Sequence, residues 1–291
     1  MELGVTAVML PELSFAEQIA LCAELGVRYY QYRPRVIGRD QRGAPYSNWG
    51  NHKFDLTPDR FLAEGAALTQ QLRDAGLEAW GTVPAVNVEA PDDELRKHLE
   101  GAARAEARCV RIAPPPYPAE PFDYAALVDR LVERYGHVID TLAEPLGIRV
   151  IIETHSRSLA TAPGLARTLC APFPPERIGV IFDMANFSRE GEINPTLAVS
   201  VLGNYIDCVH IGGGRRVTAD VDALGCRVVG HQMCALTEGD LYVSPWLEAL
   251  AATGLEPPLI IEDFTPQMAG ADRLRRSARF LHRALDALPA G

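Results

Sequence analysis

The sequence lacks any apolar run long enough to cross a membrane. A transmembrane helix needs about 20 consecutive apolar residues, and no stretch of the 291 residues comes near that length. The N-terminus, Met1-Glu2-Leu3-Gly4, leads directly into a strand-like run without the basic segment of a secretory signal. We therefore expect a cytoplasmic protein with no membrane partner.

Paired cysteines and an excess of basic charge are also missing. The net charge is -10, and an acidic chain repels phosphate backbones, which argues against nucleic acid as a partner. The six cysteines form no Cys-x-x-Cys pair, so we expect free, buried thiols and no disulfide framework. These cysteines are Cys22, Cys109, Cys170, Cys208, Cys226 and Cys234.

Short apolar, β-branched runs alternate with amphipathic stretches along the whole chain. Strict alternation predicts a parallel sheet with right-handed crossovers, and eight units in this length favour a closed barrel. We therefore predict a single (β/α)8 TIM barrel, one domain over residues 1–291, with self-association into a homo-oligomer left open. The expected strands are 3–10, 27–33, 77–86, 109–113, 148–154, 178–182, 206–211 and 259–261; the expected helices are 14–25, 57–75, 91–107, 123–146, 162–169, 195–202, 244–253 and 270–288.

The segment 212–240 shows no clear periodicity and interrupts this pattern. It begins with a triple glycine and two arginines, which lack the Gly-Lys-Ser/Thr of a nucleotide-binding loop and suggest a flexible turn. A loop of this length in a compact domain is usually a lid or an interface. We expect His231 to close over a bound ligand from this segment.

Four successive predicted strands end in a polar side chain after a purely apolar approach. Active sites of such barrels lie at the C-terminal ends of the strands, so these side chains should converge. Buried carboxylates that converge repel one another unless a cation compensates them. We therefore predict one divalent ion, with Mn²⁺ ahead of Mg²⁺, Co²⁺ and Zn²⁺. The ligands would be Glu153, Asp183, His210 and Glu262.

Alternatives remain open at several of these positions. Each strand-end residue taken alone could simply meet solvent or a neighbouring arginine. Asp263 competes with Glu262, because strand alternation lets only one of the two face the barrel interior. Arg33 and Arg111 could bind a carboxylate or phosphate of a substrate, and a plain salt bridge is an equal alternative.

The order of these ligands resembles the xylose isomerase-like TIM barrel superfamily of sugar isomerases and epimerases. The stretch Thr237-Glu238-Gly239-Asp240 before Trp246-Leu247 is similar to a Gly-Glu-Gly-Asp stretch of that family. The resemblance implies that the four residues bind the metal and that Glu153 and Glu262 also act as acid and base. The ion would polarise a substrate carbonyl, and the glutamates would move a proton at the neighbouring carbon.

The sequence also departs from that family. Asn186 stands where many relatives have a histidine, and we expect it to contact the substrate. Arg216 occupies the place of a substrate-binding arginine of ketose epimerases, although Arg215 competes with it. His155, two residues after Glu153, resembles an active-site histidine of 3-dehydroshikimate dehydratases of this fold and is a second candidate base.

Three function classes follow from this resemblance. The first is a metal-dependent isomerase or epimerase of a sugar or related polyhydroxy carbonyl compound. The alternative is a metal-dependent dehydratase of a cyclic hydroxy-ketone, of the inosose or 3-dehydroshikimate type, and a non-catalytic barrel is the third. The repair-endonuclease branch of the fold needs further histidine ligands, where this sequence offers Pro84, Asn87 and Arg111.

Overall fold

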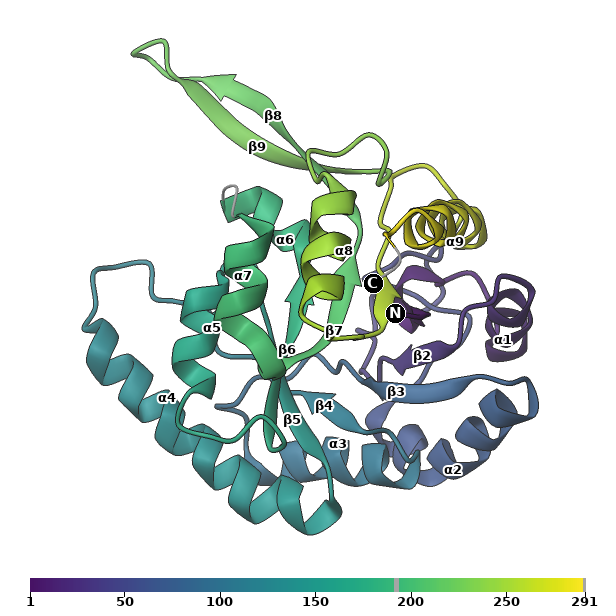
Figure 1. Cartoon of the computed structure of the whole chain (residues 1–291). Helices are drawn as coiled ribbons and strands as arrows, with labels where there is room; N and C mark the ends of the chain where they lie inside the picture. The colour runs from purple at the N-terminus through teal and green to yellow at the C-terminus, as the bar shows by residue number, and fades with distance from the viewer. Residues whose placement is uncertain (191–193, 290–291) are drawn as a thin grey trace.

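Eight parallel strands close into a barrel, which confirms the predicted fold (Figure 1). The computed structural model describes residues 1–190 and 194–289. The strands follow the order β1-β10-β7-β6-β5-β4-β3-β2 around the barrel. They are β1 (Leu3–Thr6), β2 (Tyr29–Tyr32), β3 (Glu78–Thr82), β4 (Cys109–Arg111), β5 (Arg149–Glu153), β6 (Ile178–Asp183), β7 (Ile206–Ile211) and β10 (Leu259–Ile261).

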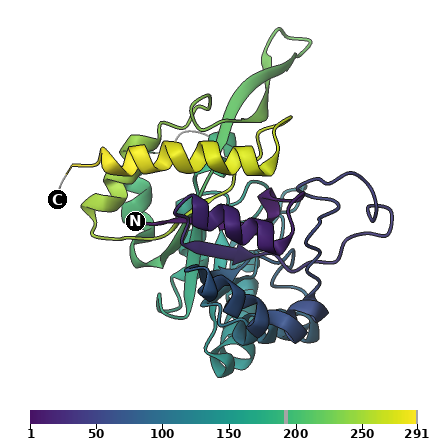
Figure 2. The same cartoon turned by 90° about the vertical axis from the view of Figure 1, so that its right-hand side faces the viewer.

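Helices cover the outside of the barrel, as both views show (Figures 1 and 2). A capping box starts the first of them: the Ser14 hydroxyl accepts from the Glu17 amide and the Glu17 carboxylate accepts from the Ser14 amide. No described helix is long and apolar enough to cross a membrane. The helices are α1 (Phe15–Glu24), α2 (Pro58–Asp74), α3 (Asp92–Arg104), α4 (Tyr124–Val138), α5 (Pro163–Cys170), α6 (Met184–Glu190), α7 (Pro195–Leu202), α8 (Val243–Ala252) and α9 (Gly270–Asp286).

The expected helix 123–146 is regular only as far as Val138. A π-helical turn, Ile139–Ala143, and a 3-10 turn, Glu144–Leu146, follow it. Pro145 has no amide hydrogen to donate to the preceding turn, so regular α-helical bonding cannot continue through it. Gly147 then ends the segment in the left-handed region, with φ of 66°.

Strand alternation separates two hydrophobic clusters. The larger one lies between the strands and the helices, and the smaller one fills the barrel interior beneath the mouth. Below this interior cluster, Arg149 and Trp80 both bond to the carboxylate of Asp207 near the N-terminal ends of the strands. The interior is therefore a packed core, and these three side chains close it near the N-terminal ends of the strands. The smaller cluster consists of Val83, Cys109, Ile151, Ile181, Cys208 and Ile260.

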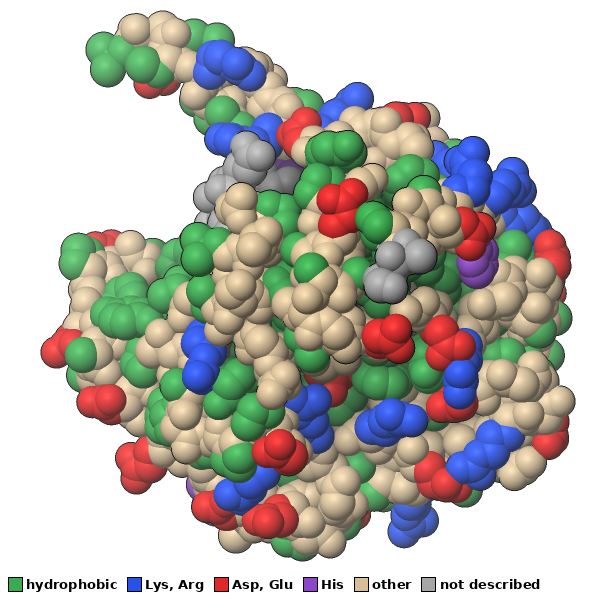
Figure 3. Space-filling view, viewed as in Figure 1, with side chains coloured by type: hydrophobic (Ala, Val, Ile, Leu, Met, Phe, Trp, Pro, Cys, Tyr) green, Lys and Arg blue, Asp and Glu red, His purple; other side chains and the backbone are tan. Residues whose placement is uncertain are grey.

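The segment 212–240 is mainly a β-hairpin, so our expectation of an unstructured loop was wrong. Strands β8 (Gly213–Val221) and β9 (Arg227–Cys234) pair antiparallel, with a register shift between Thr218 and Asp220 that disguises the alternation. The hairpin stands out from the body of the molecule (Figures 1 and 3). Cys226, just before β9, is exposed, which corrects the expectation of six buried thiols; the other five are buried.

Close backbone contacts explain the glycines at the base of this hairpin. A Cβ on Gly212 would lie 2.3 Å from the carbonyl oxygen of Glu262, and one on Gly213 would lie 2.3 Å from that of Cys234. A side chain on Gly212 would push the hairpin away from the end of β10, and one on Gly213 would push β8 away from β9. These two glycines are therefore a packing requirement at the barrel mouth and not merely part of a flexible turn.

Candidate active site

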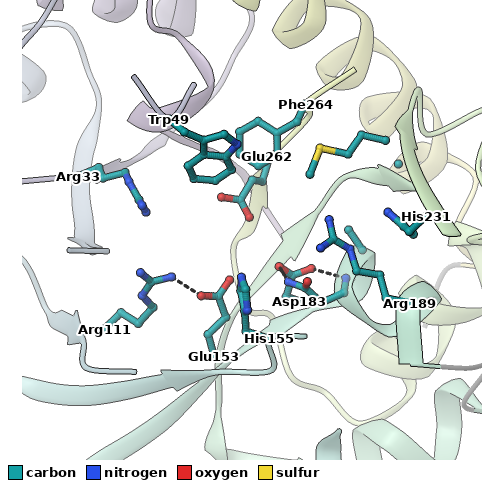
Figure 4. Close-up of a pocket in the computed structure, with 14 residues that line it drawn as sticks. Arg33, Trp49, Arg111, Glu153, His155, Asp183, Arg189, His231, Glu262 and Phe264 are labelled. Carbon is teal, nitrogen blue, oxygen red and sulfur yellow. Dashed lines mark hydrogen bonds and ion pairs between the residues drawn. The ribbon is translucent and has the colours of Figure 1, made fainter. Parts of the chain in front are cut away.

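The structure brings Glu153, Asp183, His210 and Glu262 together at the mouth of the barrel. One ligand atom of each residue lies within 4.8 Å of those of the other three. Glu153, Asp183 and His210 belong to β5, β6 and β7, and Glu262 directly follows β10. Because alternate residues of a strand face the barrel interior, all four side chains lie above the interior cluster. Figure 4 shows Glu153 and Glu262 approaching the cavity from two sides.

This donor set fits a single divalent ion. Two ligands of one ion can be no further apart than about 4.4 Å when each bond is near 2.2 Å, so the group needs to contract by only a few tenths of an ångström. Three carboxylates and one imidazole suit the hard and borderline cations. Three of the four residues are buried, and a divalent ion would compensate their mutual repulsion.

A glutamine that the sequence analysis overlooked orients His210. The side chain of Gln31, buried on β2, places Oε1 2.9 Å from Nε2 of His210. Because this oxygen can only accept, Nε2 carries the hydrogen and Nδ1 faces the carboxylates, 3.0 Å from Glu262. Burial alone would lower the pKa of His210, but the Glu262 and Glu153 carboxylates outweigh burial and raise it to about 10.

Asn186 holds Asp183 in place. Its backbone amide donates to Oδ1 of Asp183 at 3.0 Å, and its side-chain amide donates to Oδ2. Burial, reinforced by the Glu153 and Glu262 carboxylates, raises the pKa of Asp183 well above its ordinary value. Asn186 also lines the cavity. Its contact with the substrate therefore stays a prediction, in addition to its role in holding Asp183.

Arg111 forms an ion pair with Glu153. Its Nη2 also donates to the carbonyl oxygen of Pro84 at 2.8 Å, which fixes the guanidinium against the end of β3. Burial would raise the pKa of Glu153, but Arg111 and the imidazole of His210 outweigh burial and hold this pKa well below its ordinary value. Glu153 is therefore ionised at neutral pH.

A cavity of about 340 Å³ opens above these residues. A neighbouring hollow of about 530 Å³ shares part of its wall, including His155. Nδ1 of His155 lies 2.7 Å from the carbonyl oxygen of Ser156, so Nδ1 carries the hydrogen and Nε2 is the free acceptor. His231 and Met233 of β9 reach the first cavity, together with Trp49, Phe264 and Arg189 (Figure 4).

Arg216 does not line either cavity. Strand β8 carries it out of the mouth, where its side chain is exposed and its backbone amide donates to Asp240 at 2.6 Å. Arg189 of α6 lines the cavity instead. The short helix α6 gave no sequence signal for this placement, because no strand parity applies there.

The choice between Glu262 and Asp263 is settled by parity. Glu262 lines the cavity, whereas Asp263 is fully buried on the opposite face. Oδ2 of Asp263 accepts from Ser277 at 2.8 Å and pairs with Arg276 at 3.0 Å, both on α9. Asp263 thus anchors the end of β10 to the last helix and stays away from the candidate site.

Comparisons with known proteins agree with this architecture. The model of a family described as xylose isomerase-like TIM barrel matches residues 19–284. No curated protein matches the sequence. Among solved structures, the IolI protein with a bound zinc atom is 14% identical, with a TM-score of 0.74 and all of both chains covered.

Two further solved structures with the same fold are named as enzymes. An L-ribulose 3-epimerase is 13% identical, with a TM-score of 0.69, covering 98% of this chain and 95% of its own. The probable 3-DHS dehydratase AsbF of Bacillus anthracis, involved in petrobactin synthesis, is 15% identical, with a TM-score of 0.69, covering 97% of this chain and 99% of its own.

Proposed function

This chain belongs to the xylose isomerase-like TIM barrel family, and on that basis we propose that it is a metal-dependent isomerase or epimerase of a small polyhydroxy carbonyl compound. The observation that supports the proposal most directly is the convergence of four ligand atoms within 4.8 Å at the barrel mouth. Glu153, Asp183, His210 and Glu262 would hold one divalent ion, with Mn²⁺ as the first choice and Mg²⁺, Co²⁺ or Zn²⁺ as alternatives.

The bound ion would polarise the substrate carbonyl and so acidify the neighbouring C–H group. Glu153 is ionised and lies on one side of the cavity, and Glu262 lies on the other (Figure 4). One glutamate accepts the proton from carbon while the electron pair moves toward the carbonyl oxygen. The other glutamate, which enters the cycle protonated, returns a proton on the opposite face or at the adjacent carbon, which gives epimerisation or isomerisation, and both glutamates then exchange protons with solvent to restore the starting state.

The test is solvent-deuterium exchange into ketoses by the Mn²⁺-loaded protein, followed by NMR. We expect exchange at the carbon next to the carbonyl in the wild type and its loss in Glu153→Gln and Glu262→Gln. Glu248→Gln, which changes an exposed carboxylate on α8, is the control and should exchange normally. Wild-type exchange in either site variant would remove that glutamate from the mechanism, and a protein that binds no metal would refute the proposal.

A second candidate function rests on His155. Its free Nε2 and its position in the wall of both cavities suit a base that removes a proton during loss of water. A dehydratase of a cyclic hydroxy-ketone would form a conjugated product with a new ultraviolet absorbance. Appearance of this absorbance, and its loss in His155→Gln, would favour the dehydratase over the epimerase.

A further inference from the structure

The mouth of the barrel carries more positive charge than a metal site requires. Three carboxylates and three arginines line the first cavity, so their formal charges cancel when the carboxylates are ionised and His210 is neutral, as metal ligands must be. One divalent ion then leaves two positive charges without compensation. A cavity partly closed from solvent favours a ligand that supplies the missing negative charge. The arginines are Arg33, Arg111 and Arg189.

Two of these arginines lie side by side across the end of β3. Nη1 of Arg33 donates to the carbonyl oxygen of Val83 at 3.2 Å, and Nη2 of Arg111 donates to that of Pro84 at 2.8 Å. The two anchors are consecutive carbonyl groups, and the charge of Arg111 lowers the pKa of Arg33, so the two guanidiniums lie close enough to repel each other. Both face the cavity from the side opposite Asp183 (Figure 4). Such an arrangement of two like charges is unfavourable by itself, and an anion between them would relieve it.

Arg33 forms no direct ion pair among the described residues, although the Glu262 and Glu153 carboxylates stabilise its charge at longer range. Arg111, by contrast, already pairs with Glu153. The indole ring of Trp49 lies beside it, with the guanidinium carbon 5.3 Å from the ring centroid. Burial lowers the pKa of Arg33 to about 10, so its side chain is still charged at neutral pH. Its unused N–H groups form a planar donor set suited to an oxyanion.

We propose that Arg33 and Arg111 form an oxyanion subsite and that the substrate is an anionic carbonyl compound bearing a carboxylate or phosphate group. This inference rests on the proposed function, because it assigns the substrate class of the same site. The reacting carbonyl would lie toward the ligands on β5, β6, β7 and β10, and the anionic group toward β2 and β4. A neutral sugar would leave Arg33 unpaired.

The inference is tested with three matched ligands: D-fructose, D-fructuronate and D-fructose 6-phosphate. Calorimetric titration of the Mn²⁺-loaded wild type should show at least one of the two anions binding about tenfold or more tightly than fructose. Preference for fructuronate identifies a carboxylate as the source of the oxyanion, and preference for the phosphate identifies a phosphate. Equal binding of all three ligands, or no binding of either anion, overturns the inference.

Substitutions then connect this preference to Arg33. Arg33→Met should abolish the preference and leave Mn²⁺ binding within about twofold, whereas Arg33→Lys should retain part of the preference because the charge remains. Arg73→Met is the matched control, since Arg73 is exposed on α2, pairs with Glu106 and does not line this cavity. A preference that persists in a folded Arg33→Met protein, or that is lost equally in Arg73→Met, overturns the assignment.

The failure of this inference can be told apart from failure of the proposed function. Suppose that protons exchange on fructose and on both anions, and that binding shows no preference for charge. The isomerase proposal then remains intact, and the oxyanion subsite is refuted. Tight, Arg33-dependent anion binding without proton exchange on any ligand removes the isomerase proposal and retains the subsite.

Discussion

Metal binding to this protein should release protons and become tighter as the pH rises. The pKa of His210 is about 10 before a metal binds, because the adjacent carboxylates stabilise the imidazolium. A metal ligand must be neutral imidazole, so His210 has to lose its proton when the ion enters. Asp183, whose pKa is raised by burial and its carboxylate neighbours, must also be ionised to serve as a ligand.

The size of the effect follows from the pKa of His210. At pH 7 the solution lies about three units below this pKa, and each unit corresponds to about 1.36 kcal/mol. Deprotonation therefore costs about 4 kcal/mol, which weakens the apparent affinity roughly a thousandfold relative to the neutral imidazole. Below the pKa, the apparent affinity should rise about tenfold for each pH unit from His210 alone.

Calorimetric titration of the metal-free protein with Mn²⁺ checks this expectation. The observed heat at pH 7 should depend on the ionisation enthalpy of the buffer, with between one and two protons released for each ion bound. The dissociation constant should fall between pH 6 and pH 8. His137→Gln, which removes an exposed histidine of α4, should leave the proton release unchanged. Zero proton release together with equal affinity at pH 6 and pH 8 would refute the reasoning about His210.

Three further predictions concern the support of the site and of the barrel. Gln31→Leu removes the acceptor for Nε2 of His210 and should weaken Mn²⁺ binding by about 10- to 100-fold; Gln31→Glu, which keeps an acceptor, should recover part of the loss. Asp207→Leu leaves Arg149 without its partner and should lower the free energy of unfolding in urea by about 3 kcal/mol, with Mn²⁺ affinity unchanged. In the metal-free protein the pKa of His210 is higher in the folded state than in the unfolded state. The charged imidazole therefore stabilises the fold fully below about pH 6.5, and this stabilisation is lost toward pH 10. Urea unfolding in the presence of a chelator should give a lower free energy of unfolding at pH 9 than at pH 7.

The alternation of apolar runs was sufficient to predict the barrel, because strands buried on both faces have a strong sequence pattern. The same pattern located the ends of β5, β6, β7 and β10, and barrel geometry then required these ends to meet. The hairpin formed by β8 and β9 escaped prediction for the opposite reason. Most of its residues are exposed on both faces, so burial imposes no alternation on the sequence.

Parity within the strands carried more information than the sequence analysis used. Residues 29, 31 and 33 share one face of β2 and its continuation, and Gln31 and Arg33 both face the barrel interior or its mouth. A buried glutamine within Tyr29–Tyr32 was therefore a readable signal for a polar partner above the interior cluster. Arg189 offered no such signal, since it lies on a short helix whose position depends on tertiary packing.

The alternation of side chains along the strands also explains how the mouth of the barrel keeps its geometry before a metal ion binds. Thr154 follows Glu153 and faces the other way. Its hydroxyl accepts from the backbone amide of Asp183 at 2.9 Å and lies 3.3 Å from the carbonyl oxygen of Ile181. Thr154, the residue after Glu153, thus fixes the backbone of Asp183 on the adjacent strand.

Asp263 performs the equivalent task for Glu262 on the far side of the mouth. Its carboxylate is buried and bonded to Ser277 and Arg276 of α9, so β10 cannot shift without breaking charged hydrogen bonds. A site whose ligands must approach one another within 4.8 Å against their own repulsion needs such external restraint. The polar residues that face away from the cavity therefore act together with Arg111 and the His210 imidazolium, which pair with the carboxylates, to hold the ligands in place before a metal binds.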